Sequence, residues 1–470
     1  MLLNPEKINT AALAAIDDVG RKITYGELIE KGKDLAHAAH PRSLVFCLCE
    51  NSVGGLLGYV GLYENNQIPL LLDASLHRDL MQRLIDIYTP AYIWVPQKYS
   101  SNYSIKIIHQ EYDYVLGKTD FSPCPVHDSL SLLLTTSGST GSPKLVRHKY
   151  GNIEANARNV AIAFSWTADE RPICSLPMQY TMGLNVITTH LYVGATLLLS
   201  GESLTSPLFW NFIQEQRGTN FTGVPYSYDV FFKLKFARMS LPHLTTLAVG
   251  GGKMTEKNFL ELASYAEKNG KRFFSTFGTT ETSARMACLQ PEYSLSKCGS
   301  IGKAIPEGQL FLRDDTGQII HDAEAVGELC YHGPNVTMGY AEKKADLLLG
   351  DTFSGEYATG DLARRDAEGF YFITGRLKRF VKVFGLRISL DQCEQAIQEK
   401  FNDECACTGT DNKIEIFITN NSLSSEVKFF ISKTMQIAAS SLQVHCISEI
   451  PKSDSGKISY NTLKQLQKEY

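Results

Sequence analysis

The sequence predicts an α/β fold: a large N-terminal domain of layered α/β subdomains plus a small β-rich subdomain, followed by a small mobile α+β C-terminal domain. Three observations predict it. Between residues 23 and 289, apolar runs of strand length alternate with segments whose apolar spacing suits a helix. After about residue 300 the pattern changes to short strands and Gly-centred turns. Residues 376–470 then mix helix and strand patterns.

Length and composition indicate a globular protein with more than one domain. The chain has 470 residues, which is too many for one hydrophobic core to keep growing. Its apolar share of 43% and charged share of 20% exclude a disordered or collagen-like chain. A net charge of -4, from 46 basic and 50 acidic residues, gives no electrostatic footprint for nucleic acid or an anionic membrane. The expected partners are therefore small molecules or individual proteins.

The first residues and the cysteines indicate a cytoplasmic protein. A proline and two charged residues at positions 5–7 interrupt the N-terminal segment before an apolar signal-peptide region forms. The eleven cysteines are interpreted as reduced thiols. The C-x-C pairs Cys47/Cys49 and Cys405/Cys407 have no second Cys/His pair nearby, so buried strand cysteines are favoured over a metal site.

Strand and helix candidates define the N-terminal domain. Each strand candidate is a short apolar run, and each helix candidate has apolar residues spaced to form one face. The strands are expected at residues 44–48, 91–95, 131–134, 195–199 and 246–249. The helices are expected at residues 25–37, 152–163 and 256–268. In such mainly parallel sheets, ligands gather where the strands end and the loops begin.

The later part of the chain predicts a second domain. Strands at 308–312 and 369–373 indicate a mostly antiparallel subdomain. The segment 375–379 interrupts this pattern, so we place the domain boundary there, which gives domains 1–375 and 376–470. The second domain is expected to contain helices at 390–400 and 426–439 and a strand at 413–419.

The expected strand 131–134 leads into the stretch TTSGSTGSPK, residues 135–144. Its glycines and proline favour turns and let the backbone approach a ligand, while its hydroxyls and Lys144 supply donors and a positive charge. These groups suit the oxygens of a polyphosphate. The spacing is not that of the P-loop, because Pro143 precedes the lysine and Leu145 follows it. On its own, the stretch is also compatible with an ordinary surface loop.

Five further stretches follow this loop in order. They are FGTTE at 277–281, YATGDL at 357–362, GRLKRFVK at 375–382, GLRI at 385–388 and PKSDSGKI at 451–458. Together with TTSGSTGSPK they resemble the adenylate-forming superfamily of AMP-binding enzymes, which includes acyl-CoA synthetases, peptide-synthetase adenylation domains and firefly luciferase. The weaker matches ITYGEL at 23–28 and GEL at 327–329 extend the resemblance to nearly the whole chain.

The resemblance implies an ATP-dependent acid-thiol ligase that works in two steps. A small carboxylic acid attacks the α-phosphate of MgATP and gives an acyl-adenylate and pyrophosphate. A phosphopantetheine thiol, of CoA or of an acyl-carrier protein, then displaces AMP. The expected cofactors and co-substrates are therefore ATP, Mg²⁺ and CoA or a phosphopantetheinyl carrier. Because charge builds up on phosphate oxygens, fixed donors and cations should contribute most to the first step.

The resemblance also implies ATP-binding roles for individual residues. Glu281 matches the magnesium-binding acid, and Thr280 would donate to the α-phosphate. Asp361 and Arg376 would hold the ribose hydroxyls. A helix N-terminal acid is the alternative for Glu281, and a turn-capping aspartate is the alternative for Asp361. The other implied nucleotide-binding residues are Thr136, Ser137, Gly138, Ser139, Thr140, Gly141 and Lys144 at the phosphates, and Gly251, Gly252, Lys253, Phe277, Gly278 and Thr279 around the adenine.

Four residues of the expected C-terminal domain match catalytic or hinge positions of the superfamily. Lys457 matches the lysine that bridges the substrate carboxylate and the α-phosphate; taken alone, it would be an ordinary solvated charge. Lys378 stands at the hinge position between the domains. Lys382 and Gly385 belong to the loop that faces the active site in the second step, where Gly385 would let the thiol-bearing arm pass. Such a domain motion often limits turnover.

The acyl pocket is the hardest part to assign. Its candidate lining is Tyr180, Asn185, Val224, Tyr226 and Gly250, and each of these residues could instead belong to the ordinary core. No aspartate stands where peptide-synthetase domains pair with the α-amine of their substrate. This absence disfavours an ordinary α-amino acid as the substrate, although Asp229 leaves room for an amine elsewhere in the substrate.

Two positions depart from the superfamily pattern. Leu145 stands where glycine usually follows the loop lysine, and Tyr460 replaces the arginine often found three residues after the catalytic lysine. Neither change removes a group that must contact ATP.

Two other functions remain open at this point. One is an amino-acid adenylation enzyme that loads a carrier protein, and the other is a non-catalytic nucleotide-binding homologue. The joint presence of Glu281, Asp361, Arg376 and Lys457 argues against the second.

Overall fold

The computed structural model describes residues 2–3, 8–135, 144–383, 386–410, 413–452 and 458–466, without the side chains of Lys378, Phe380, Lys382, Leu386 and Arg387. The chain divides into two compact units. Of the described residues, the first unit holds those up to 135, those from 144 to 310 and Tyr331–Tyr357. The second unit holds Phe311–Cys330 and the described residues from 358 onward. The domain boundary between residues 375 and 376 stays a prediction.

A nine-stranded sheet runs through the first unit. Its strands, in spatial order, are β16 (Lys303–Ala304), β15 (Ala284–Leu289), β14 (Arg272–Thr279), β13 (Thr246–Val249), β12 (Asn220–Gly223), β10 (Pro172–Cys174), β11 (Leu197–Leu199), β1 (Leu13–Asp17) and β2 (Lys22–Thr24). The strands from β14 to β1 pair in parallel, and β15, β16 and β2 pair antiparallel at the edges. The carboxyl ends of β12, β13 and β14 therefore lie along one edge of the sheet.

An eight-stranded sheet forms the second layer of the first unit. Its strands, in spatial order, are β19 (Tyr340–Ala341), β9 (Leu145–Lys149), β8 (Leu130–Thr135), β4 (Ile68–Asp73), β3 (Leu44–Cys49), β5 (Tyr92–Pro96), β7 (Tyr114–Lys118) and β6 (Lys106–Glu111). The four central strands β8, β4, β3 and β5 pair in parallel. The outer strands pair antiparallel.

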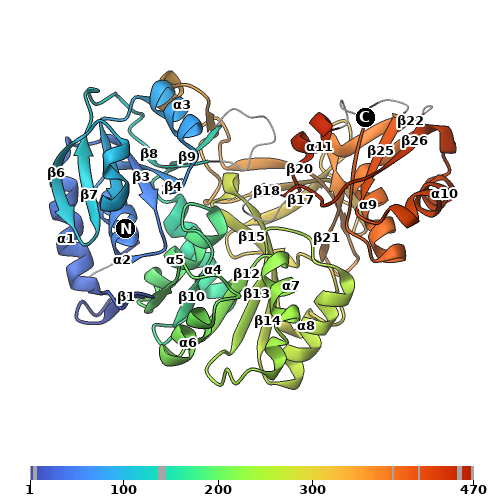
Figure 1. Cartoon of the computed structure of the whole chain (residues 1–470), viewed down its shortest axis with the longest axis horizontal. Coiled ribbons are helices and arrows are strands. Elements are labelled where there is room, and N and C mark those ends of the chain that lie inside the picture. Colours follow the sequence, from blue (N-terminus) through green and yellow to red (C-terminus); the bar gives the residue numbers. More distant parts are fainter. Residues whose placement is uncertain are drawn as a thin grey trace. The chain divides into compact units, whose positions relative to one another are not determined.

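Four helices contribute buried side chains to a core that they share with strands of both sheets, and Figure 1 shows where they lie. They are α1 (Tyr25–His37), α2 (Val53–Glu64), α4 (Asn152–Phe164) and α5 (Thr181–Tyr192). A single buried cluster joins Val45 of β3, Ile153 of α4, Ile187 of α5 and Leu197 of β11. Helix α1 begins where Thr24 and Glu27 form a capping box, which satisfies free backbone amides of its first turn.

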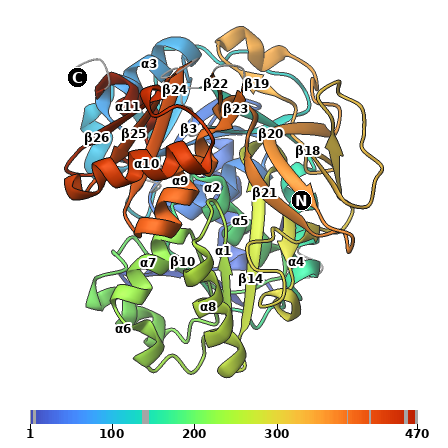
Figure 2. The ribbon, with the colours of Figure 1, turned by 90° about the vertical axis from the view of Figure 1, so that its right-hand side faces the viewer.

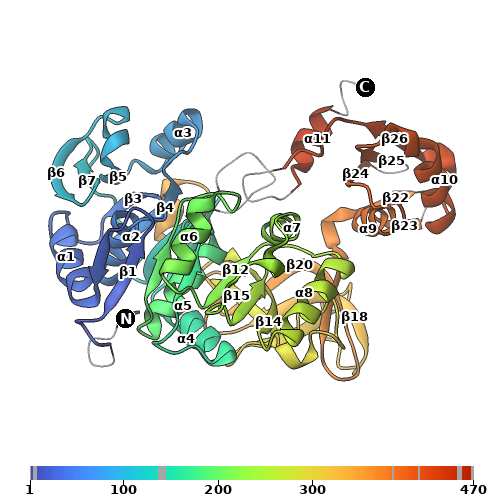
Figure 3. The ribbon, with the colours of Figure 1, turned by 60° about the horizontal axis from the view of Figure 1, so that its bottom comes forward.

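Other helices cover further faces of the two sheets (Figure 3). They are α3 (Arg78–Tyr88), α6 (Pro207–Glu215), α7 (Pro225–Lys233) and α8 (Glu256–Lys268). Phe231 of α7 lies 4.6 Å from Phe221 of β12, and Phe259 of α8 lies 5.2 Å from Phe273 of β14, between ring centroids. Helix α3 packs on the eight-stranded sheet through Met81 and Leu84. The short 3-10 helices of the first unit are η1 (Gln97–Asn102), η2 (Phe236–Arg238), η3 (Thr280–Thr282), η4 (Pro291–Tyr293) and η5 (Lys344–Leu348).

The second unit is built from small sheets and three helices. A four-stranded sheet belongs mainly to this unit and consists of β17 (Gln309–Arg313), β18 (Ala325–His332), β20 (Glu356–Arg365) and β21 (Tyr371–Arg376). A two-stranded sheet follows, made of β22 (Phe380–Val383) and β23 (Leu386–Ser389). The last sheet has the strands β24 (Cys405–Thr410), β25 (Lys413–Ile418) and β26 (Leu442–Cys446). Its helices are α9 (Leu390–Phe401), α10 (Ser424–Thr434) and α11 (Tyr460–Leu466), with η6 (Leu377–Arg379), η7 (Asn421–Leu423) and η8 (Ala439–Ser441).

The sheet β24–β26 has a helix layer on each face. Helices α9 and α10 pack together through Ile397 and Val427 against Ile416 of β25 (Figure 2). Helix α11 packs against the other face, where Leu463 contacts the cluster around Phe417. This arrangement confirms the small α+β region expected near the C-terminus.

The α/β class is confirmed, and the expected elements are present with small shifts at their ends. One helix end differs clearly. The helix expected at 426–439 is α10, which ends at Thr434. Gln436 has a φ of 53°, in the left-handed region that an α-helix cannot contain, so the helix stops before it.

All eleven cysteines are free thiols: nine are buried, Cys298 is half-buried and Cys446 is exposed. Both C-x-C pairs lie buried on strands, as expected, and the sulfur atoms of Cys47 and Cys49 are 4.0 Å apart. Within the described ranges, no group of three or more His, Cys, Asp or Glu side chains is placed to hold a metal ion. No helix in the same ranges is both long and apolar enough to cross a bilayer.

Candidate active site

The predicted phosphate-binding stretch stands between two paired strands. Thr136, Ser137, Gly138, Ser139, Thr140 and Gly141 lie outside the described residues. The residues at its two ends, Thr135 of β8 and Leu145 of β9, are antiparallel partners. The stretch is therefore anchored at both ends at the edge where the parallel strand β8 finishes.

Lys144 is described, and it lies over an aromatic ring. Its Nζ is 3.4 Å from the centroid of the Tyr340 ring and 3.9 Å from Oε1 of Glu342. The ring face attracts the ammonium group, so Tyr340 holds the lysine at the end of the loop.

Leu145 explains its own departure from the superfamily pattern. It is fully buried, and it pairs with Thr135 on one side and Ala341 on the other. Its side chain belongs to the core of the eight-stranded sheet. Leucine therefore stabilises the strand that starts directly after Lys144.

Glu281 lies in the short helix η3, directly after β14, and phenols surround its carboxylate. The Tyr340 hydroxyl donates to its Oε1 at 2.7 Å, and the Tyr357 hydroxyl is hydrogen-bonded to both Glu281 and Tyr340. Burial, and then the charge of Glu281, raise the pKa of both phenols, so both stay protonated donors.

The donor set at Glu281 fits Mg²⁺. Mg²⁺ usually takes one or two carboxylates from the protein and its other ligands from phosphate and water. Glu281 provides one carboxylate, which accepts hydrogen bonds from the uncharged hydroxyl groups of Tyr340 and Tyr357. Such partners orient the carboxylate and leave its charge for a metal ion.

Thr280 connects this turn to helix α5. Its Oγ1 accepts a hydrogen bond of 2.8 Å from Oγ1 of Thr181, the first residue of α5. The expected α-phosphate ligand and the start of the expected acyl-pocket helix are therefore in direct contact.

Two glycines near the expected adenine site stand where other residues would not fit. Gly278 has no room for a side chain, and Gly251 has a positive φ. A Cβ at Gly278 would lie 1.5 Å from the backbone oxygen of Ala284, so only glycine fits between β14 and β15. Gly251 has a φ of 76° and packs beside Val224. Phe277 and Thr279 flank Gly278 on β14, while Gly252 and Lys253 are exposed beyond β13.

The five candidate pocket residues fall into different environments. Tyr180 precedes α5, and Asn185 is buried one turn into it. A Cβ at Gly250 would lie 2.5 Å from both Met182 Cε and Thr276 Oγ1, so Gly250 stands in a crowded wall. Val224 precedes α7, whereas Tyr226 is 54% exposed. The pocket assignment of these residues stays a prediction.

Asp361 and Arg376, for which a shared role at the ribose is predicted, meet in the second unit. They are partners in the register of β20 and β21, and Arg376 Nε donates to Asp361 Oδ1 at 3.0 Å. The Asp361 side chain is 7% exposed and the Arg376 side chain is 66% exposed. The carboxylate is therefore buried, while the guanidinium is accessible to solvent.

The remaining predicted residues fall largely outside the described part of the structure. Lys457 and Gly385 lie outside the described residues, and only the backbone is described at Lys378, in η6, and at Lys382, in β22. The segment that contains Lys457 is closed at its base by a bridge between Lys452 and Ile458. These four roles stay predictions.

Sequence reasoning missed Tyr340, Tyr357 and Thr181 as members of the site. Tyr357 is the first residue of the YATGDL match, but the match gives it no role, and 59 positions separate Glu281 from Tyr340 along the chain. Only the folded chain shows that they meet.

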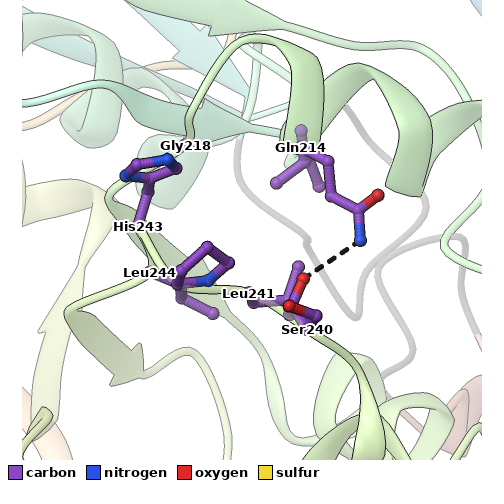
Figure 4. Close-up of a pocket in the computed structure, with 8 residues that line it drawn as sticks. Gln214, Gly218, Ser240, Leu241, His243 and Leu244 are labelled. Atoms are coloured by element: carbon purple, nitrogen blue, oxygen red, sulfur yellow. Dashed lines mark hydrogen bonds between the residues drawn. The ribbon is translucent and has the colours of Figure 1, made fainter.

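A different pocket lies on the surface of the first unit (Figure 4). It is lined by Ile213, Gln214, Gly218, Ser240, Leu241, Pro242, His243 and Leu244. Gln214 Nε2 donates to the backbone oxygen of Ser240 at 3.1 Å across it. The pocket lies before the amino ends of β12 and β13, opposite the strand ends where ligands gather, and none of the predicted site residues lines it.

Comparison with known proteins places the chain in a family. The family model for AMP-binding enzymes matches residues 6–341. A 2-succinylbenzoate–CoA ligase of Enterococcus faecalis is 26% identical over 271 residues, which cover 58% of this chain and 54% of that protein. Another, from Geobacillus sp., is 24% identical over 99% of this chain and 95% of its own length.

A solved structure shows the same fold. The o-succinylbenzoate CoA synthetase of Bacillus subtilis, in complex with its acyl-adenylate intermediate, has a TM-score of 0.78 at 20% identity. The match covers 96% of this chain and 95% of that chain. With the family model matching more than half of its length, the chain belongs to the family of AMP-binding enzymes.

Proposed function

We propose that this chain is an ATP-dependent ligase that joins a small carboxylic acid to the thiol of CoA. The observation that carries the proposal is the site of the first unit, where Lys144, Thr280 and Glu281 gather at the carboxyl ends of parallel strands. Together these residues provide a cation, a hydroxyl group and a carboxylate, which are the groups that bind a nucleotide and its metal ion.

In the first step, a carboxylate oxygen of the acid attacks the α-phosphorus of ATP, and the bond to pyrophosphate breaks. Lys144 and the stretch before it hold the departing phosphates, while Thr280 donates to the α-phosphate. Glu281 would hold Mg²⁺, which neutralises phosphate charge when it is bound. Asp361 and Arg376 hold the ribose, and Lys457 bridges the two reacting groups.

In the second step, the thiol sulfur attacks the acyl carbon, and AMP leaves. We propose that domain 376–470 rotates relative to domain 1–375 between the two steps, about the hinge at Lys378. This rotation would replace Lys457 at the site with the loop that contains Lys382 and Gly385. CoA is favoured over a carrier protein as the acceptor, because the similar 2-succinylbenzoate ligases are named as CoA ligases. The eleven free thiols support a reducing, cytoplasmic location.

The proposal predicts acid-dependent exchange of labelled pyrophosphate into ATP. A panel of aryl, aliphatic, hydroxy and amino acids, with 2-succinylbenzoate as one member, identifies the acid class. Lys457→Ala should lower this exchange by about two to three orders of magnitude, the scale for losing one preorganised charge contact. Product analysis with CoA and with a phosphopantetheinylated carrier then identifies the acceptor.

Lys452→Ala is the matched control for Lys457→Ala. Lys452 stands at the base of the same segment and pairs with Glu404 at the surface, so its loss should leave exchange within about twofold of the wild type. Equal rates for the Lys457 variant and the wild type would remove the catalytic assignment. Nucleotide binding without exchange for any acid would favour a non-catalytic nucleotide-binding protein instead.

A further inference from the structure

Arg285 is a fully buried cation beside the candidate acyl pocket. It lies on β15 and is 1% exposed. Its Nη1 donates to Oδ1 of Asn185 at 2.5 Å, and its Nη2 donates to Oγ1 of Thr222 at 3.1 Å. The guanidinium carbon lies 5.0 Å from the centroid of the Phe164 ring. The guanidinium thus meets one amide, one hydroxyl and one ring, all of them uncharged.

No carboxylate pairs with Arg285 within the described ranges. Its Nε has no hydrogen-bond partner there. Burial lowers the pKa of the guanidinium to about 10, so it still carries its charge at neutral pH. Burial, and then the charge of Arg285, lower the pKa of the neighbouring His190 to about 3, so this imidazole is neutral beside the guanidinium. Burying an unpaired charge is costly, which calls for a partner that the described part of the chain does not contain.

The position of Arg285 points to the substrate as that partner. Asn185 is a candidate pocket residue on α5, and the same helix begins at Thr181, whose hydroxyl bonds Thr280. Thr181 and Asn185 are four residues apart, so roughly 6 Å of helix separates the activation centre from the amide that holds Arg285. Thr222 stands near the carboxyl end of β12, on the ligand side of the sheet.

We propose that Arg285 binds a second carboxylate of the acid substrate, so that the preferred substrate is a short diacid. The inference rests on the proposed ligase function and deepens it. One carboxylate is activated at Thr280, and the other pairs with the guanidinium. There it would accept a hydrogen bond from the unpaired Nε, and it could replace the Asn185 oxygen as the acceptor of Nη1. The two carboxylates stand about one helical turn apart, which fits a spacer of a few carbon atoms or one aromatic ring.

Matched pairs of acids test the proposal on the wild-type enzyme. Succinate is compared with butyrate, glutarate with valerate, and 2-succinylbenzoate with 4-oxo-4-phenylbutanoate, which lacks only the ring carboxylate. Pyrophosphate exchange should show a kcat/KM about tenfold to a hundredfold higher for the better diacids than for their partners, the scale for a charge-assisted hydrogen bond. Equal or better use of the neutral-tailed acids would overturn the inference and leave the ligase function standing.

Two variants identify the residue responsible. Arg285→Gln should abolish the preference for diacids and keep exchange with neutral-tailed acids, while Arg285→Lys should keep part of the preference. Arg272→Gln is the control, because this arginine lies at the amino end of β14, pairs with Glu170 and stacks near Trp166. A preference that survives Arg285→Gln would overturn the inference. Absence of exchange with every acid would overturn the ligase function and this inference together.

Discussion

Glu281 is held by phenols, and this choice of partner suits the metal-binding role proposed for it. A lysine or arginine at the position of Tyr340 would neutralise the carboxylate and compete with Mg²⁺. The Tyr340 hydroxyl instead donates one hydrogen bond of 2.7 Å and carries no charge. The same ring holds Lys144 on its face, with Nζ 3.4 Å from the centroid. One side chain therefore contacts both the cation and the anion that we propose for nucleotide binding.

Removing the Tyr340 hydroxyl should weaken metal use. Tyr340→Phe keeps the ring below Lys144 and deletes the bond to Glu281. Because one hydrogen bond contributes about 1 kcal/mol, we expect the Mg²⁺ concentration for half-maximal pyrophosphate exchange to rise roughly fivefold. Tyr25→Phe, which loses a buried bond to the backbone oxygen of Ala195, is the control for losing a phenol hydroxyl. An unchanged Mg²⁺ requirement in the Tyr340 variant would contradict a positioning role.

Two buried histidines should make the first unit sensitive to acid. Burial lowers the pKa of His148 from 6.5 to about 4 and that of His190 from 6.5 to about 3. Below pH 6.5 the unfolded chain binds protons that the folded chain excludes, so stability present above this pH is lost as pH falls toward 4 and 3. Each histidine contributes a slope of up to about 1.4 kcal/mol per pH unit.

The variant His148→Leu isolates one of these slopes. Between about pH 6.5 and 4, the free energy of unfolding of this variant should fall less steeply with decreasing pH than that of the wild type. The difference in slope should correspond to the uptake of up to one proton on unfolding. Urea unfolding at several pH values measures the slope, with pH 7.5 as the reference condition. Parallel pH profiles for the two proteins would refute the assignment.

At the scale of elements, helix α11 is tied to the segment that follows the predicted hinge. Tyr460, its first residue, donates to Oε2 of Glu394 at 3.0 Å, and its ring lies 3.8 Å below the guanidinium carbon of Arg379. Arg379 pairs with the other Glu394 oxygen at 2.6 Å and with Asp391. Tyr460, which stands where the superfamily often has arginine, thus packs its ring against the cation of Arg379 in η6. This cluster fixes the residues directly after the Lys457 segment.

Loosening that anchor should affect the two reaction steps differently. Tyr460→Phe removes the bond to Glu394, so Lys457 should be held less well and pyrophosphate exchange should fall about three- to tenfold. Thioester formation from preformed acyl-adenylate should stay unchanged, because the proposed role of Lys457 is confined to the first step. Tyr371→Phe, a buried tyrosine of β21 whose hydroxyl contacts Arg365, is the control. Equal losses in both steps would indicate general destabilisation.

Sequence patterns predicted the buried strands well and the exposed ones poorly. β3 and β8 are continuous apolar runs because sheets and helices cover them, so their composition alone identifies them. β6 is an exposed edge strand rich in polar residues, and no apolar run marks it. The short strand β19 consists of Tyr340 and Ala341 and exists only through pairing with β9. Such nonlocal pairing leaves no local signal.

The same distinction holds for the candidate site. Motif order indicated Glu281, Asp361 and Arg376, and the structure brings the last two into contact. The contact of Glu281 with Tyr340 and the burial of Arg285 depend on packing between distant segments. No spacing rule in one sequence connects β15 to α5, so the sequence alone cannot indicate a buried cation beside the pocket.

At the scale of the whole molecule, the chain order and the spatial units do not coincide. Phe311–Cys330 belongs to the second unit, and the chain then returns to the first unit for Tyr331–Tyr357. This returning segment carries Tyr340 and Tyr357, the partners of Glu281. The composition change near residue 300 indicated a new subdomain, but alternation between the units depends on strand pairing that composition does not encode.

The distribution of thiols offers a direct optical probe of this organisation. Nine cysteines are buried, while Cys298 in the first unit is half-buried and Cys446 in the second is exposed. A maleimide dye should therefore mark each unit at one native position, without engineered residues. Energy transfer between two such dyes would report the separation of the units in solution as ATP, acid and CoA are added in turn.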